Sequence, residues 1–285
     1  MTSKSDQLNG RVVAITGGAR GIGKATAEAL VAAGAKVVIG DLDADLVAAS
    51  AAEIGGGTVG LPLDVTDRES FEQFFDAAEA ASGTIDVLIN NAGIMPVGRF
   101  LEEDDATARR QIDVNVHGVL FGMKIALPRF VERGNGHLIN IASAAGKGGF
   151  PGVATYSGTK HFVVGVSEAA RLELRGSGVD ISCVMPNIVN TDLGSGIGQA
   201  RFVPKSEPQD VANAIVATIK KPHFDVYVPA FLGPLAQVVN TLPRSGREGL
   251  MRFLKADTVI LDGDWDARKS YEDRASKSDP KHEKL

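Results

Sequence analysis

Short β-rich apolar runs alternate with stretches in which apolar residues recur at helical spacing, from about residue 11 to residue 228. The runs predict strands at 11–16, 36–40, 58–63, 87–89, 137–142, 179–185 and 224–228. The stretches predict helices at 21–34, 43–54, 67–82, 104–133, 154–175 and 206–220, with capping boxes of Thr66 with Glu69 and Ser206 with Gln209. The alternation predicts one doubly wound α/β domain over residues 1–230. We expect a parallel sheet of about seven strands with helices on both faces.

The chain after residue 230 departs from this alternation. Residues 226–243 carry no charge, but Pro229, Gly233 and Pro234 interrupt them, so we expect a strand and a short apolar helix rather than a membrane span. Residues 231–261 are expected to form an apolar helical extension that packs near the ligand site, with a peripheral membrane contact as the alternative. Thirteen of the last 24 residues are charged, which predicts a disordered tail over 262–285.

Composition then narrows the class of protein. The 285 residues are 44% hydrophobic and 23% charged, with a net charge of −5 and no basic stripe, which argues against a nucleic-acid partner. The histidines are scattered, and no metal site is expected. Cys183 is the only cysteine and lies in an apolar run, so we expect a buried thiol and no internal disulfide. The first nine residues are polar and lack an apolar signal core, so we expect a reducing, cytoplasmic location.

A glycine-rich segment between the first strand and the first helix predicts a dinucleotide site. Gly17, Gly21 and Gly23 allow a tight turn in which the backbone approaches a pyrophosphate at the helix N-terminus. Asp41 closes the second strand, where a carboxylate can bind ribose hydroxyls and repel a 2′-phosphate. This favours NAD over NADP, although Arg20 in the turn could attract a phosphate.

Tyr156 and Lys160 stand four residues apart on a predicted helix, so they share one face, and Ser143 precedes Tyr156 by thirteen residues. An ammonium near a phenol favours the phenolate, which should lower the tyrosine pKa and make the pair a proton-transfer device. Each residue alone has an ordinary structural alternative, such as a helix cap or a solvated pair. His117 is expected to be a helix residue near a subunit contact.

Together these motifs resemble the short-chain dehydrogenase/reductase family, from about residue 8 to residue 228. The matching features, in order, are the 16–23 glycine segment, Asp64-Val65, Asn90-Asn91-Ala92-Gly93, Asn115, Ser143, Tyr156-x-x-x-Lys160, and Pro186 with Thr191. The resemblance implies a Rossmann fold and an NAD-dependent oxidoreductase that interconverts an alcohol and a ketone or aldehyde.

The resemblance also implies residue roles. Tyr156 would be the acid/base, Lys160 would lower its pKa and bind the nicotinamide ribose, Ser143 would bind the substrate oxygen, and Asn115 would hold a water. The implied cofactor-binding residues are Gly17, Arg20, Gly21, Ile22, Gly23, Asp41, Asp64, Val65, Asn91, Ala92, Gly93, Tyr156, Lys160, Pro186, Ile188 and Thr191.

Two departures from the family pattern affect this prediction. Asn187 stands where glycine usually follows Pro186, and its side chain could reach the substrate or cofactor. The chain also continues beyond the terminal strand that forms the family's common tetramer. We therefore expect a homodimer through the long helices that carry Asn115 and Tyr156, with higher homo-oligomers still open.

The predicted pocket residues are apolar, which favours a steroid-, retinoid- or long-chain-like alcohol. They are Met95, Pro96, Val97, Phe150, Val153, Leu193, Ile197 and Phe202. An NADPH-dependent ketoreductase and a non-catalytic NAD(H)-sensing protein are the alternatives.

Overall fold

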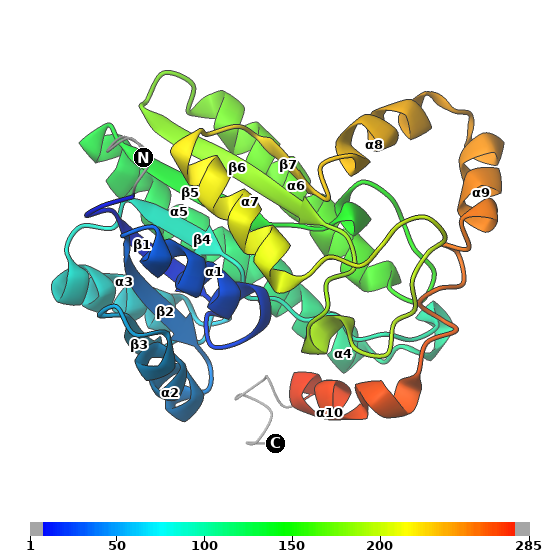
Figure 1. Ribbon diagram of the computed structural model, residues 1–285, viewed down its shortest axis with the longest axis horizontal. Coiled ribbons are helices and arrows are strands. Elements are labelled where there is room, and N and C mark those ends of the chain that lie inside the picture. Colours follow the sequence, from blue (N-terminus) through cyan, green and yellow to red (C-terminus); the bar gives the residue numbers. More distant parts are fainter. Residues whose placement is uncertain (1–7, 277–285) are drawn as a thin grey trace.

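A single parallel sheet of seven strands forms the centre of the computed structural model, which describes residues 8–276 (Figure 1). The strands run in the order β3-β2-β1-β4-β5-β6-β7. They are β1 (Val12–Thr16), β2 (Lys36–Asp41), β3 (Val59–Pro62), β4 (Val87–Asn90), β5 (Gly136–Ile141), β6 (Val179–Pro186) and β7 (Asp225–Val228). The order reverses between β1 and β4, and such a switch point is where doubly wound folds bind ligands. The predicted fold class is confirmed.

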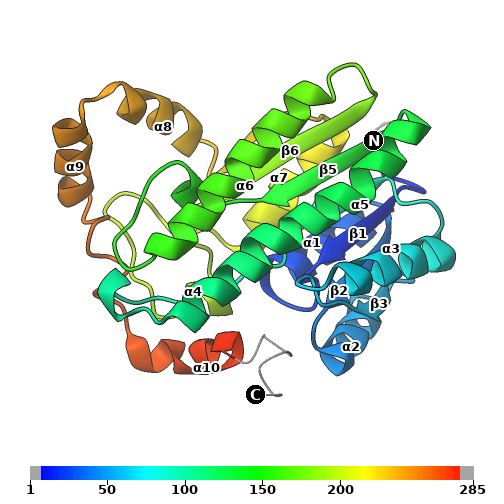
Figure 2. The same ribbon diagram turned by 180° about the vertical axis from the view of Figure 1, so that it is seen from behind.

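Helices cover both faces of the sheet, as the two opposite views show (Figures 1 and 2). One face packs against α1 (Gly21–Ala32), α2 (Ala44–Ile54) and α7 (Pro208–Lys220). The other packs against α3 (Arg68–Ser82), α5 (Gly118–Arg133) and α6 (Ala154–Glu173). The short helix α4 (Asp105–Ile112) lies against α6. Side chains of β1 alternate between the two cores: Val12 faces one and Val13 the other. The strands therefore have apolar residues on both sides.

The helix predicted over 104–133 contains a π-helical turn that its sequence pattern does not reveal. This turn, η3 (Asp113–His117), joins α4 to α5 and includes the buried Asn115. π-Turns insert an extra residue into a helix and often occur at functional sites.

The N-caps of α3 and α7 each lie one residue after the predicted one, and of these two helices only α7 has a capping box. Asp67, not Thr66, caps α3 and accepts the Glu69 N–H at 2.9 Å. In α7 the pair is Glu207 and Asp210, because Asp210 accepts the Glu207 N–H at 2.8 Å. Thr66 instead donates its hydroxyl to Asp64.

Three further helices follow the sheet. They are α8 (Leu232–Thr241), α9 (Arg244–Phe253) and α10 (Trp265–Ser276). In both views α8 and α9 stand out from one end of the molecule, whereas α10 runs back beneath α4 (Figures 1 and 2). Within the described residues 8–276, none of the helices has the length and apolar character needed to cross a membrane.

The prediction of a disordered tail from residue 262 is wrong for the segment that forms α10. Arg268, Tyr271 and Ala275 of this helix are buried at spacings of three and four residues, on one face. This buried face is not evident from the sequence, because one of its three positions is an arginine and the rest of the segment is rich in charged residues. The rest of the predicted tail, residues 277–285, lies outside the described residues.

Candidate active site

The glycine segment forms a tight turn between β1 and α1. Gly17 and Gly21 have φ values of +64° and +54°, which favour glycine. A Cβ on Gly23 would lie 2.2 Å from the Gly17 carbonyl oxygen, so the helix can start this close to the turn only with glycine there. Arg20 provides no side-chain cap to the first N–H groups of α1. This turn therefore fits a pyrophosphate, which uncapped N–H groups can bind.

Thr16 and Asn91 join the glycine turn to the end of β4. The Asn91 side-chain amide donates to the carbonyl oxygens of Thr16 and Gly17, each at 2.9 Å. The Thr16 hydroxyl accepts the N–H groups of Asn91 and Ala92 at 3.1 and 3.0 Å. These bonds fix the two carboxyl strand ends that border the predicted cofactor site.

Asp41 stands at the end of β2, beside the turn. Its Oδ2 accepts the Ala19 N–H at 3.2 Å. Arg20 extends toward Asp43, with Nη2 and Oδ2 3.9 Å apart. Asp64 is held by Thr66, whose backbone N–H and hydroxyl donate to Oδ1 at 2.9 and 2.7 Å. Asp41, Arg20 and Asp64 all line the same cavity.

Ser143, Tyr156 and Lys160 meet at the carboxyl ends of β5 and β6. Tyr156 and Lys160 lie in the first two turns of α6 and are 7% and 4% exposed, respectively. Lys160 Nζ lies 5.6 Å from the centre of the Tyr156 ring and donates to the Ile141 carbonyl oxygen at 2.8 Å. The Ser143 hydroxyl accepts the Ala145 N–H at 3.1 Å.

Burial dominates the acid–base properties of this cluster. It raises the pKa of Tyr156 to about 12, against the smaller, opposite effects of the Ser143 hydroxyl and the Arg268 charge. Burial also lowers the pKa of Lys160 to about 8. The direction for Tyr156 is opposite to the one expected from sequence, because removing the phenolate from water outweighs nearby positive charge.

Asn115 lies beneath this cluster and contacts the loop after β4. Its Oδ1 accepts the Ile94 N–H, and its Nδ2 donates to the Ile94 carbonyl oxygen, both at 2.9 Å. Nδ2 also lies 3.2 Å from the Thr159 hydroxyl oxygen. The Asn115 side chain thus shapes the backbone beside Gly93 and Lys160, and its predicted contact with a water stays a prediction.

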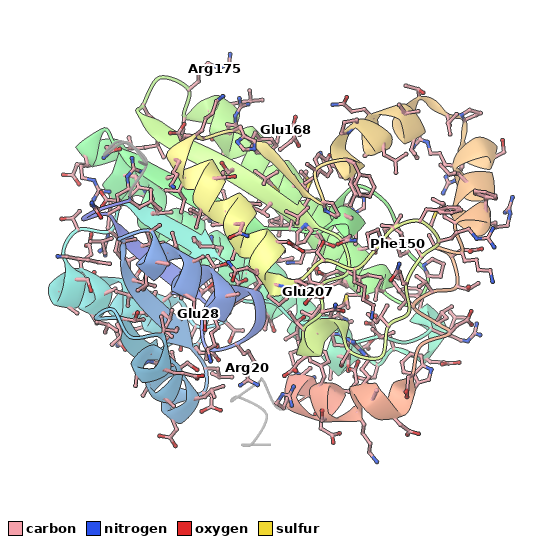
Figure 3. All side chains as sticks on the ribbon, viewed as in Figure 1. Arg20, Glu28, Phe150, Glu168, Arg175 and Glu207 are labelled. Atoms are coloured by element: carbon pink, nitrogen blue, oxygen red, sulfur yellow. The ribbon has the colours of Figure 1, made fainter. Side chains whose placement is uncertain are left out.

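One cavity of about 940 Å³ joins the glycine turn to the tyrosine. Sixteen of the predicted site residues line it, and Gly23 and Asn115 lie behind its wall. Those that line it are Gly17, Arg20, Gly21, Ile22, Asp41, Asp64, Val65, Asn91, Ala92, Gly93, Ser143, Tyr156, Lys160, Pro186, Ile188 and Thr191. Figure 3 places Arg20 at the start of α1 and Phe150 at the other end of the region, toward α9.

The expected pocket residues divide into two groups. Met95, Phe150, Val153, Leu193 and Ile197 line the cavity. Pro96 and Val97 border a smaller hollow, and Phe202 is 74% exposed, stacked on Phe253 with ring centres 6.4 Å apart. Phe202 therefore contributes to the surface and not to the cavity.

Asn187 lines the cavity, but both ends of its side chain are engaged by the loop before α7. Its Nδ2 donates to the Pro204 carbonyl oxygen at 2.5 Å, and its Oδ1 accepts the Ser206 hydroxyl at 2.7 Å. These bonds hold the Asn187 side chain toward that loop, and not toward the substrate or cofactor as the sequence suggested.

Sequence reasoning missed the part of the wall that α10 contributes, and it named only the general region of the α8–α9 part. The cavity is also lined by Leu235 and Val239 of α8, Leu250 and Met251 of α9, and Tyr271 of α10. The apolar composition of residues 231–261 indicated α8 and α9. For α10, the available signal was the spacing of Arg268, Tyr271 and Ala275, which are three and four residues apart and so lie on one helix face. Among the described residues, no cluster of His, Cys, Asp or Glu could hold a metal ion.

Comparison with known proteins agrees with this geometry. Residues 11–201 match the family described as short chain dehydrogenase. The chain is 37% identical over 221 residues to 2,5-dichloro-2,5-cyclohexadiene-1,4-diol dehydrogenase of Sphingobium indicum, covering 73% of this chain and 88% of that one. It is 35% identical over 216 residues to 3-alpha-(or 20-beta)-hydroxysteroid dehydrogenase of Mycobacterium tuberculosis, covering 74% and 83%. It is 34% identical over 216 residues to sorbitol dehydrogenase of Cereibacter sphaeroides, covering 74% and 84%.

Solved structures show the same fold. A short chain dehydrogenase/reductase from Burkholderia phymatum in complex with NAD superposes with a TM-score of 0.75 at 25% identity, covering 82% of this chain and 94% of that one. The 3-ketoacyl-(acyl-carrier-protein) reductase from Brucella melitensis complexed with NADH gives 0.71 at 27% identity, covering 78% and 98%. The glycine turn, the Ser143–Tyr156–Lys160 cluster and these matches together establish that the chain belongs to the short-chain dehydrogenase family, whose members are NAD(P)-dependent oxidoreductases.

Proposed function

We propose that this protein is an NAD-dependent dehydrogenase that interconverts an apolar alcohol and its ketone or aldehyde. One observation carries the proposal. Ser143, Tyr156 and Lys160 lie at the middle of one cavity, between a glycine turn suited to a dinucleotide and a mainly apolar chamber. Such an arrangement can hold a cofactor and a substrate side by side at an acid/base group.

The three residues divide the proton chemistry. In alcohol oxidation, the Tyr156 phenolate accepts the proton of the substrate hydroxyl, and the Ser143 hydroxyl donates a hydrogen bond to the same oxygen. Lys160 supplies positive charge near the phenol, at 5.6 Å from the ring centre. In reduction, Tyr156 returns the proton to the carbonyl oxygen. A bound nicotinamide supplies the hydride acceptor or donor.

The residues around the glycine turn fit that cofactor and favour NAD. The uncapped first turn of α1 would bind the pyrophosphate. Asp41 would accept hydrogen bonds from the adenosine ribose hydroxyls and would repel a 2′-phosphate. Arg20 is turned toward Asp43, which reduces its availability for such a phosphate. Pro186, Ile188 and Thr191 would border the nicotinamide.

The substrate class follows from the chamber beyond Tyr156. Its walls include Met95, Val153, Ile197 and Ile260, which pack with Tyr156 in one apolar cluster. Leu250 and Met251 of α9 extend the apolar lining. A bulky apolar alcohol, of steroid, retinoid or long-chain type, suits such a site. The named hydroxysteroid relative supports this class, whereas the named sorbitol relative favours a polar polyol.

We propose a homodimer through α4, α5 and α6. Exposed apolar side chains lie on the outer sides of these helices: Ile112 at 41%, Val131 at 40%, Phe162 at 37% and Leu172 at 50% exposure. Light scattering coupled to size-exclusion chromatography tests this, and a change of Leu172 to Glu should give a monomer.

The deciding experiment follows NADH formation at 340 nm with steroid, retinoid, aliphatic and sugar alcohols. The Tyr156→Phe variant should lose at least about 100-fold in kcat, because the acid/base is gone, while it still binds NADH. Turnover confined to sugar alcohols would contradict the apolar substrate. Turnover with NADP⁺ in preference to NAD⁺ would favour an NADPH-dependent ketoreductase. NADH binding without turnover of any substrate would favour an NAD(H)-sensing protein.

A further inference from the structure

The C-terminal helix α10 is connected to both loops that form the substrate end of the cavity. One loop follows β4 and includes Met95. The other follows β6 and includes Leu193 and Ile197. Both loops line the cavity, and Met95 and Ile197 pack against Tyr156 in the same apolar cluster. In Figures 1 and 2, α10 lies across this end of the molecule, next to α4.

Arg268 makes most of this connection, from a position behind the cavity wall. It is 2% exposed. Its Nη1 donates to the carbonyl oxygens of Leu193 at 2.6 Å and Ser195 at 3.1 Å, and its Nη2 donates to the Met95 carbonyl oxygen. Its Nε donates to Glu272 Oε1 at 2.6 Å. One guanidinium therefore binds both loops and its own helix, which the fork of five donors permits and a lysine ammonium does not.

Neighbouring residues of α10 add weaker links to the same loops. The Tyr271 hydroxyl oxygen accepts the Met95 N–H at 2.7 Å, and the Arg268 guanidinium lies 4.6 Å from the Tyr271 ring centre. Glu272 Oε1 accepts the Val97 N–H at 3.3 Å. Arg274 Nη2 lies 2.6 Å from Asp192 Oδ2. Arg268 differs from these three residues because it contacts both loops at once.

From these contacts we propose that Arg268 is a positioning residue for the reaction: it holds the two loops together around Tyr156 and keeps a fixed positive charge close to that residue. The inference deepens the proposed function and rests on it, since it assigns how the substrate end of the same site is shaped.

The charge and the loop contacts make separate contributions. Tyr156 is faced by Lys160 on its own helix, by Ser143 after β5, and by Arg268 and Tyr271 from α10, with Glu272 beside Arg268. The positive charge of Arg268 lowers the pKa of Tyr156, against the larger effect of burial. The phenolate that accepts the substrate proton is thus easier to form with Arg268 present. The loop contacts act on the shape of the apolar chamber and so on substrate binding.

Two substitutions separate these contributions, and a third serves as a control. Arg268→Met removes the charge and the donors, whereas Arg268→Lys keeps the charge but cannot reach all four acceptors. Lys269→Met removes the same charge from the exposed side of the same helix. In the full-length enzyme, kcat, KM and their pH dependence are measured with the best alcohol, and the Kd of NADH is measured separately.

We expect both Arg268 variants to raise KM for the alcohol at least ten-fold while the Kd of NADH changes less than two-fold. Arg268→Met should in addition move the rise of kcat with pH to higher pH. Arg268→Lys keeps the positive charge, so its kcat should show the wild-type pH dependence. Lys269→Met should match wild type. Equal behaviour of Arg268→Met and Lys269→Met would overturn the proposal. A second result would also overturn the proposal. If Arg268→Met loses NADH affinity, alcohol affinity and thermal stability in parallel, and Arg268→Lys loses them equally, the role of Arg268 is purely structural.

Hydrogen–deuterium exchange tests the loop contacts without a substrate. In Arg268→Met, exchange should accelerate in residues 94–98 and 192–198 but not in the glycine turn at 17–23. Unchanged exchange in both loops would overturn the inference even if the enzyme is active. Acceleration confined to these loops, in a protein that oxidises no alcohol, would retain the role of Arg268 in joining the loops and reject only the proposed function.

Discussion

Asn115 and Ile94 exchange two hydrogen bonds of 2.9 Å, in which the asparagine side chain binds both the N–H and the C=O of one buried backbone unit. The π-helical turn at Asp113–His117 orients this side chain. The loop held in this way contains Gly93, where a Cβ would lie 3.2 Å from Asn115 Oδ1 and 3.6 Å from Lys160 Nζ. The bond pair therefore fixes the backbone that borders Lys160.

Changing Asn115 to Ala should lower both stability and activity. Both polar groups of the Ile94 backbone would lose a buried partner, which costs about 1–3 kcal/mol in the free energy of unfolding for each unsatisfied group. The loop beside Lys160 would also lose its fixed position, so kcat should fall. Urea unfolding and steady-state kinetics measure the two effects.

The control for this prediction is Asn213→Ala on the exposed side of α7, where the asparagine accepts a hydrogen bond from Gln209. Its stability should change by less than about 0.5 kcal/mol, as for most surface substitutions. Equal stability of the two variants would show that the Asn115–Ile94 bonds contribute nothing to the fold.

Asp41→Asn should relax the preference for NAD⁺ over NADP⁺. The amide oxygen can still accept the Ala19 N–H, so the substitution removes the negative charge without removing this bond. Without repulsion of a 2′-phosphate, the ratio of kcat/KM for NAD⁺ to that for NADP⁺ should fall at least ten-fold, or about 1.4 kcal/mol. Kinetics with both cofactors measure this ratio.

Asp43→Asn provides the comparison for Asp41, because it removes the same charge two residues along the chain. Asp43 caps α2 by accepting the Leu46 N–H at 3.0 Å, which an asparagine can also do. The cofactor preference of this variant should change much less. If Asp43→Asn relaxes the preference and Asp41→Asn does not, Asp43 and its partner Arg20 determine the preference instead.

The sequence predicts features that depend on short stretches and misses those that depend on distant contacts. The glycine turn and the Tyr156–Lys160 spacing are local, so both the fold and the placement of these residues at the cavity follow from pattern. The π-turn at Asn115 leaves no mark in hydrophobic spacing. The burial of Arg268 depends on carbonyl groups more than 70 residues away, such as that of Leu193. From the charged C-terminal segment alone, an arginine such as Arg268 is expected to be exposed to solvent.

The pKa of Tyr156 shows the same limit. Its neighbour on the helix, Lys160, is readable from spacing, and it suggested a lowered value. The dominant cause is burial by residues from several elements, including Met95, Ile197 and Ile260, which no local pattern reveals. Charge neighbours can be predicted from sequence, but desolvation depends on the completed fold.

His137 should make the protein acid-sensitive. This β5 residue is 2% exposed, and its Nε2 lies 2.9 Å from the Ser182 hydroxyl oxygen. Ser182 donates its own proton to the His223 carbonyl oxygen at 2.6 Å, so it must accept from His137, which places the imidazole proton on Nε2. Nδ1 has no hydrogen-bond partner among the described residues. A second proton would thus be buried without compensation.

Burial, with smaller effects of the Arg11 and His223 charges, lowers the pKa of His137 to about 4, whereas an unfolded histidine titrates near 6.5. As pH falls from 6.5 to 4, the unfolded state gains a proton that the folded state does not. Stability is therefore present above pH 6.5 and is lost through this window, by about 3 kcal/mol in total.

Urea unfolding at pH 7.5 and pH 5 should show about 2 kcal/mol of this loss in wild type. His137→Gln should reduce it, because glutamine can donate to Ser182 and does not titrate. His117→Gln, at a histidine that is 50% exposed, should retain the wild-type pH dependence. Parallel pH dependence in wild type and His137→Gln would mean that His137 is not the source of the acid sensitivity.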